Sequence, residues 1–175
     1  MAKHKNKKIP PATPTGSTNI PEPNLPINSF NFRTHYNWLK TVTFEDFTNN
    51  YKDEKVFSET IIKIIHEIIP DLYDNYEDIF NNHRAKKTPL FHSHILTDDA
   101  LKLAKKIAKL ITNTNIDNDL YSWWQIGGKQ GIRIVGVYLS DSKVFYPIFI
   151  DCYHLLFPNE YYNQTDYNKL GYSIA

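Results

Sequence analysis

Apolar residues recur with the period of an α-helix in the first two thirds of the chain. Six isoleucines within residues 58–69 fall at spacings of one, three and four residues, which predicts a helix with a wide apolar face. We expect that helix to stop at Pro70 and a shorter helix to follow over residues 71–82. The clearest helix begins after Thr97, where leucine, isoleucine and alanine interleave with lysine, and it ends at the polar residues 112–119.

Beyond Leu120 the apolar pattern changes to the two-residue alternation and short continuous runs of β-strands. Short turns rich in glycine, serine and aspartate separate the segments, which predicts an antiparallel meander of three to four strands. Proline donates no ladder hydrogen bond, so Pro147 indicates an edge or a bulge in the third segment. The predicted strands are residues 121–126, 132–139, 143–151 and, as a short fourth strand, 153–157.

Two short segments come before the helices. Alternation in residues 29–33 predicts a strand with Phe30 and Phe32 on one face. Thr43 and Asp46 have the spacing of a capping box, which predicts the start of a short helix. We therefore expect an α+β fold in which N-terminal helices precede a C-terminal sheet, built as a single domain over residues 29–175.

Residues 1–28 differ in composition from the rest of the chain. They hold six of the ten prolines, none of the aromatic residues, and four lysines against one glutamate. We expect a disordered basic tail, which either keeps the chain in solution or touches phosphate or an acidic partner. Its net charge of +3 leaves −2 on residues 29–175, so the body of the chain is not strongly basic.

Cysteine content and hydropathy narrow the class of protein. The single cysteine, Cys152, excludes an internal disulfide and a cysteine-based structural zinc site. No apolar run approaches the roughly 18 residues that span a membrane, and the basic start is not followed by the apolar segment of a secretory signal. We therefore expect a cytoplasmic protein with no cofactor, no bound metal and no membrane partner.

Lysines gather on one side of the clearest helix and just upstream of it. Two interpretations stay open: a solvated helix face, or a stripe that binds phosphates without reading sequence. A neighbouring tryptophan on the first strand of the meander adds a surface on which a base could stack. The candidate nucleic-acid-binding residues are Lys86, Lys87, Lys102, Lys105, Lys106, Lys109 and Trp124.

The meander also carries the candidate catalytic groups. Arg133 stands between two isoleucines, so its side chain faces away from theirs, and Asp151 and His154 lie at a strand end. His154 suits general acid–base catalysis; the alternative is an Asx-type turn with a histidine packed on the sheet. Gly127–Gly131, which contains Lys129, favours a hairpin turn over a phosphate loop because it joins two strands.

Two further histidines, His92 and His94, lie two residues apart. Two ligands do not complete a zinc site, and the sequence supplies no third, so we interpret both as loop residues.

The segments Gly131–Tyr138, Lys143–Asp151 and His154–Phe157 together resemble the closing meander of RelE/ParE-like toxins. The resemblance implies a toxin-like RNA-binding protein and a metal-independent ribonuclease of the messenger RNA interferase type, with RNA or the ribosome and an antitoxin-like protein as partners. It implies that Arg133 stabilises a phosphate, that His154 takes the late basic position, and that Phe157 or Tyr161 takes the late aromatic one. Lys129 would add positive charge, and Asp151 would either orient His154 or repel phosphate.

Two other functions remain open from the sequence. One is a non-enzymatic protein-interaction module, or an accessory subunit of a host–virus defence or counter-defence system, that docks a partner through its sheet and aromatic surface. The other is a structural nucleic-acid-binding protein that uses the two lysine clusters, whose binding should weaken steeply as salt rises.

Overall fold

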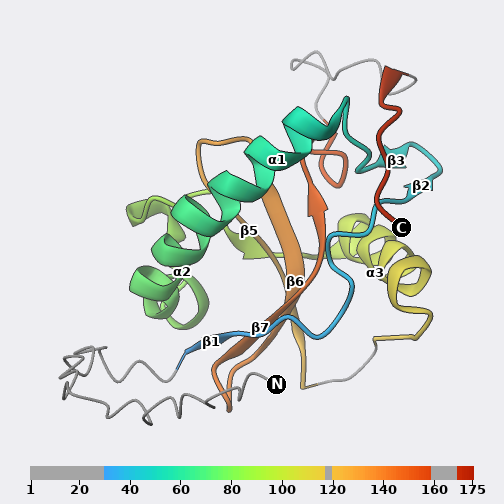
Figure 1. The fold of residues 1–175 in the computed structure, drawn as a ribbon. Helices are drawn as coiled ribbons and strands as arrows, with labels where there is room; N and C mark the ends of the chain where they lie inside the picture. The colour runs from blue at the N-terminus through green and yellow to red at the C-terminus, as the bar shows by residue number, and fades with distance from the viewer. Residues whose placement is uncertain (1–29, 117–119, 159–168) are drawn as a thin grey trace, which may run out of the picture.

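A five-stranded sheet forms the centre of the protein (Figure 1). The computed structural model describes residues 30–116, 120–158 and 169–175. The strands lie in the order β1–β7–β6–β5–β4; β1 runs parallel to β7 and the other neighbours are antiparallel. Their bounds are β1 Asn31–Phe32, β4 His94–Ile95, β5 Ser122–Gly127, β6 Arg133–Leu139 and β7 Val144–Asp151. The α+β class and the C-terminal meander, β5 to β7, are confirmed.

One long helical segment covers the first face of the sheet. It runs through α1 (Glu54–Lys63), the π-helical η1 (Ile64–Ile68), α2 (Ile69–Tyr76) and the π-helical η2 (Glu77–Asn81) without interruption. The predicted stop at Pro70 is therefore wrong. The π-turn just before the proline explains why, since the Ile69 N–H reaches the Ile64 carbonyl five residues back and widens the helix where a proline ring would otherwise clash.

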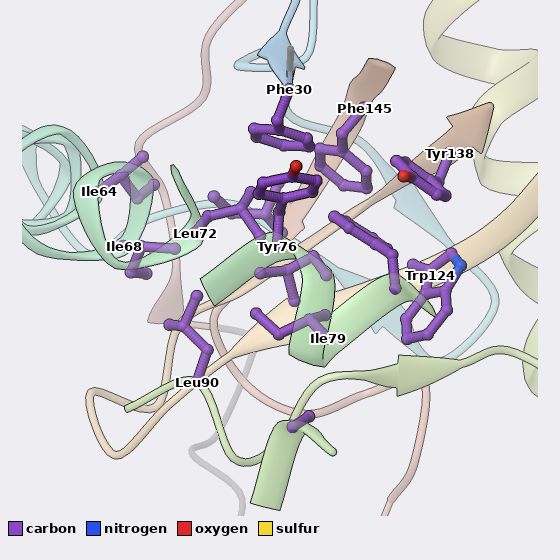
Figure 2. Close-up of a cluster of buried hydrophobic side chains, with 14 of the residues drawn as sticks. Phe30, Ile64, Ile68, Leu72, Tyr76, Ile79, Leu90, Trp124, Tyr138 and Phe145 are labelled. Carbon is purple, nitrogen blue, oxygen red and sulfur yellow. The ribbon is translucent and has the colours of Figure 1, made fainter. Parts of the chain in front are cut away.

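The core under this helix is apolar and rich in aromatic rings (Figure 2). Phe80 stacks on Tyr138 with ring centroids 3.9 Å apart and meets the edge of Trp124 at 5.0 Å. Trp124 is only 2% exposed and its indole N–H donates to the Ser122 hydroxyl. The expectation that Trp124 forms a stacking surface is therefore not met, because the helical layer buries this face of the sheet.

The second face is covered by α3 (Asp98–Thr112) and by a small hairpin of β2 (Thr43–Phe44) and β3 (Phe47–Thr48). Successive tryptophans of β5 enter opposite cores, Trp123 on this side and Trp124 on the other. The helix predicted at Thr43 is wrong, since its hydroxyl bonds that of Thr48 across the hairpin, 3.0 Å away, instead of capping a helix.

The register shifts between Val135 and Gly136, opposite Pro147, so the bulge expected there is present. Residues 153–157 form turns and not the expected fourth strand, and the short η3 helix (Ala85–Lys87) precedes β4. In the part of the chain that the structure describes, no helix is long and apolar enough to cross a membrane. The basic tail and Tyr161 lie outside the described residues.

Candidate functional site

Polar side chains gather at one end of the sheet, on the face that α3 covers. His94 pairs with Gln125, and Arg133 pairs with both Gly127 and Asp151. Paired residues of neighbouring strands point to the same face. His92 comes just before β4 and His154 just after β7, at the same end. We call this group the polar cluster; its members are His92, His94, Gln125, Arg133, Asp151 and His154.

Arg133 is the most unusual member of the polar cluster, because its guanidinium is almost wholly buried. Its side chain is 3% exposed; one terminal nitrogen donates to the carbonyls of Gly128 at 2.9 Å and Ile132 at 3.0 Å, while Nε is buried without a partner. Burial lowers the pKa of Arg133, and the nearby Asp151 charge opposes this. No ion pair to Arg133 forms among the described residues. A buried cation in this state is costly unless an anion joins it.

Gly127 makes room for this arginine. A Cβ atom at position 127 would lie 2.6 Å from Cδ and 2.8 Å from the terminal nitrogen of Arg133. The Arg133 side chain thus crosses β5 at Gly127, where β5 has no side chain. A residue without a Cβ atom is needed at this position to leave room for the arginine. The turn that follows is the hairpin expected from the sequence, with Gly131 at a φ of 77°.

His92 and His154 both have a pKa below the ordinary value. For His92 the causes are burial and the charges of Arg133, His154 and His94. For His154 burial and Arg133 outweigh the opposing effects of Asp151 and of a hydrogen bond to the Gly131 backbone. Both imidazoles are therefore neutral near pH 7 and able to accept a proton.

His94 and Gln125 share a hydrogen bond that sets the histidine tautomer. Nδ1 of His94 lies 3.1 Å from the Ile95 carbonyl, which can only accept, so Nδ1 carries the hydrogen and Nε2 accepts from the Gln125 amide at 3.3 Å. The Oε1 atom of Gln125 is buried and has no partner. The His94 ring meets Phe157 edge-on, with centroids 5.0 Å apart.

Asp151 holds the turn that carries His154. One carboxylate oxygen accepts the backbone N–H groups of Tyr153 at 3.0 Å and Leu155 at 3.1 Å, and the other accepts that of Leu156 at 3.0 Å. This is the Asx-type arrangement named above as the alternative. Asp151 is fully buried, so it positions His154 through the backbone and has no open oxygen lone pair facing solvent.

The structure brings His154, Arg133 and Asp151 together but does not add the lysines to them. Lysine is absent from the charges that shift the pKa of His92 and His154. Lys129 lines a pocket of about 420 Å³ with His66, Glu67, Asp71, Pro89, Phe91 and Gln130. Lys102 pairs with Asp99 at 2.9 Å and Lys106 with Glu45 at 3.3 Å, whereas Lys86, Lys87 and Lys109 are exposed and Lys105 is half-buried.

The sequence analysis did not single out Gln125, and it weighed His92 and His94 as metal ligands before it interpreted both as loop residues. Within the described residues no group of three histidine, cysteine or acidic side chains is arranged to hold a metal ion. The pairing of β4 with β5, which places His94 beside Gln125, depends on strands separated by a whole helix. The two-residue spacing of the histidines was the one local signal.

The fold is that of an α+β protein, with a candidate histidine–arginine site at one end of its sheet. Residues 33–175 match the family described as "Uncharacterised protein UU032", and the chain belongs to that family. A relative with the same description, from Ureaplasma parvum serovar 3, is 29% identical over 140 residues, which cover 78% of this chain and 74% of the relative. No solved structure matches the chain.

This family membership corrects the resemblance to RelE/ParE-like toxins, which is wrong. The features that carried the resemblance were a short antiparallel meander and an arginine between two isoleucines. Successive residues of any strand point to opposite faces, so a meander and one such arginine do not identify a family.

Proposed function

We propose that the polar cluster binds RNA through a backbone phosphate and cleaves the adjacent ester bond by histidine acid–base catalysis. One observation carries the proposal: the guanidinium of Arg133 is buried, is not ion-paired among the described residues, and keeps an unpartnered Nε. Arginine suits phosphate because its planar donors match the phosphate oxygens in pairs. Asp151 lies nearby, but its carboxylate oxygens accept backbone N–H groups, so a phosphate would supply the direct ion pair that Arg133 lacks among the described residues.

The neutral histidines fit the proton transfers that RNA cleavage needs. One imidazole of the pair His92 and His154 accepts the proton of the ribose 2′-hydroxyl, whose oxygen then bonds to phosphorus. The second imidazole, protonated, gives its proton to the 5′-oxygen as the phosphorus–oxygen bond breaks. The products are a 2′,3′-cyclic phosphate and a free 5′-hydroxyl, and Arg133 stabilises the charge of the pentacovalent state.

Phosphate binding also explains how one imidazole becomes protonated. Burial and Arg133 hold the pKa of His92 and His154 low in the free protein. A bound phosphate offsets the Arg133 charge and favours the protonated form of either ring. Ligand binding should therefore take up protons, and affinity should rise as pH falls from 8 towards 6.

The direct test uses an end-labelled RNA of mixed sequence and the full-length protein, with EDTA present. His154→Gln and Arg133→Met should each lower the cleavage rate about 100-fold or more. This is the rate factor that an acid–base group or a charge-stabilising group usually contributes. Lys102→Gln, an exposed position on α3, is the matched control and should cleave normally. Cleavage that persists in both site variants with unchanged circular dichroism would contradict the proposal.

The sheet edge favours a second function, a protein-interaction module. β4 is the terminal strand of the sheet, and its Ile95 is exposed. An open edge can receive a strand from another protein. Ile95→Lys should then abolish co-purification of a partner while leaving RNA cleavage intact; unchanged co-purification would remove this candidate.

A further inference from the structure

We propose that the RNA taken by the polar cluster is single-stranded, with unpaired bases stacked on Phe157 and Phe91. The inference rests on the proposed function, since it names the form of RNA that the same site receives. It is carried by two aromatic side chains whose exposure sets them apart from the other aromatic residues of the described chain.

Phe157 is held beside the polar cluster with its ring open to solvent. It is 41% exposed, its ring meets His94 edge-on, and its backbone N–H donates to the His154 carbonyl at 3.1 Å. The turn that presents His154 therefore also fixes Phe157. A base resting on this ring would lie beside His94 and the turn that carries His154.

Phe91 makes a similar contact on the other histidine. It is 39% exposed, and its ring centroid lies 4.4 Å from that of His92 at an interplanar angle of 45°. Within the described residues, Phe91 and Phe157 are exposed, whereas the other phenylalanine, tyrosine and tryptophan side chains are buried or half-buried. Both contact histidines of the polar cluster, so their exposure coincides with the proposed anion site.

Exposed aromatic rings beside a buried arginine favour a single strand over a duplex. A base in a double helix has both faces covered by its neighbours, whereas an unpaired base can leave the stack and lie on an aromatic side chain. Such stacking accepts every base, so the site should bind single strands with little sequence preference. An apolar protein partner would use the phenylalanines but would leave Arg133 without an anion.

The test compares three ligands on the full-length protein, whose basic tail is then common to all variants. They are a fluorescent 2′-O-methyl oligoribonucleotide that cannot be cleaved, the same strand annealed to its complement, and inorganic phosphate. We expect the single strand to bind more tightly than the duplex. Phe157→Leu should weaken single-strand binding roughly 5- to 150-fold, the fold-change that corresponds to one lost stacking contact, and should leave phosphate binding unchanged.

Conservative and distant variants separate stacking from a general effect. Phe157→Tyr keeps a ring and should retain most of the affinity, and Phe91→Leu should weaken binding like Phe157→Leu. Leu110→Ala, an exposed apolar position on α3, is the matched control and should bind normally. Equal binding of single strand and duplex, with Phe157→Leu unaffected and phosphate still bound, would overturn this inference and leave the proposed function standing. If the unaltered protein does not bind phosphate, both this inference and the proposed function are overturned.

Discussion

The two faces of the sheet are built from the same strands but treat polar groups differently. The face under α1 and α2 has a core of apolar residues with stacked rings. The face under α3 has a comparable apolar core, but at one end it gives way to the polar cluster. Ile134 on β6 and Ile132 just before it enter the first core, while Arg133 between them enters the second face. One strand thus serves stability and the candidate site by simple alternation.

The charged groups of the second face differ in what they leave open. Arg133 and Asp151 are the charged residues among the buried side chains of the described chain, and they stand opposite each other in the register of β6 and β7. Asp151 accepts three backbone N–H groups, whereas Arg133 keeps a buried Nε with no partner. Asp151 therefore contributes to the fold, while Arg133 keeps a donor without a partner, the one we propose binds a phosphate. We therefore expect substitutions in the first face to change stability alone, and substitutions in the polar cluster to change ligand binding or cleavage as well.

The largest loss of stability should come from the first face. Phe145 is fully buried in the core beneath α1 and α2 (Figure 2), so Phe145→Ala should lower the free energy of unfolding by about 3–5 kcal/mol. Urea denaturation measures this. Ile62→Ala, at an exposed position of α1, should change it by less than about 0.5 kcal/mol. Similar losses in the two variants would show that the first face is not packed as described.

Asp151→Asn should lower both stability and activity. An asparagine has one acceptor oxygen, so part of the set of three N–H groups loses its partner, at about 2–4 kcal/mol from charged hydrogen bonds worth about 1.5–3 kcal/mol each. Cleavage should fall as well, because the turn that positions His154 loosens. The exposed Asp141→Asn is the control. A fully stable Asp151→Asn protein would show that the carboxylate does not hold the turn.

Gly127→Ala should abolish phosphate binding while lowering the free energy of unfolding only moderately. The new methyl group would collide with the Arg133 side chain and with the Ile132 carbonyl, so we expect a stability loss of about 1–3 kcal/mol from overpacking together with loss of phosphate binding. Gly171→Ala is the matched control, because nothing lies within 4 Å of a Cβ atom there. Phosphate binding that survives Gly127→Ala would mean that the position of Arg133 is not needed.

Stability should decline as the pH falls below about 6.5, the ordinary pKa of histidine. His92 and His154 have lowered pKa values in the folded state, so the unfolded chain takes up protons first and gains population. The contribution of these two neutral imidazoles to the free energy of unfolding is complete above about pH 6.5. It is lost as the pH falls through the folded-state pKa values. The double variant His92→Gln, His154→Gln should have a flatter profile of melting temperature between pH 8 and 5. An identical profile would contradict neutral histidines in the folded state.

The smallest effects should come from the lysines of α3. Lys102 and Lys109 are exposed and do not shift the pKa of His92 or His154. Replacing both with glutamine should leave the melting temperature unchanged and reduce the salt dependence of RNA binding slightly. A loss of RNA binding as large as that of Arg133→Met would move the main binding surface to α3.

Local pattern carried much of the fold and part of the site. Periodicity was enough for α3 and for the meander, and alternation around Arg133 placed its side chain opposite two isoleucines. The prediction at Pro70 was wrong because a π-turn lets the helix continue through the proline. The prediction at Thr43 was wrong because its hydroxyl bonds across a hairpin and does not cap a helix. Gln125 could not be found, since its place beside His94 depends on a strand pairing that spans α3. Residue spacing predicts local structure and does not predict contacts between segments that lie far apart in the sequence.

Histidine and arginine side-chain NMR during phosphate titration tests the anion site most directly. The chain has seven histidines and three arginines, so His92, His154 and Arg133 can be assigned with single variants. We expect added phosphate to raise the pKa of His92 and His154 and to shift the Nε–H signal of Arg133, leaving those of Arg33 and Arg84 in place. Unchanged histidine titration and an unmoved Arg133 signal at saturating phosphate would contradict an anion site in the polar cluster.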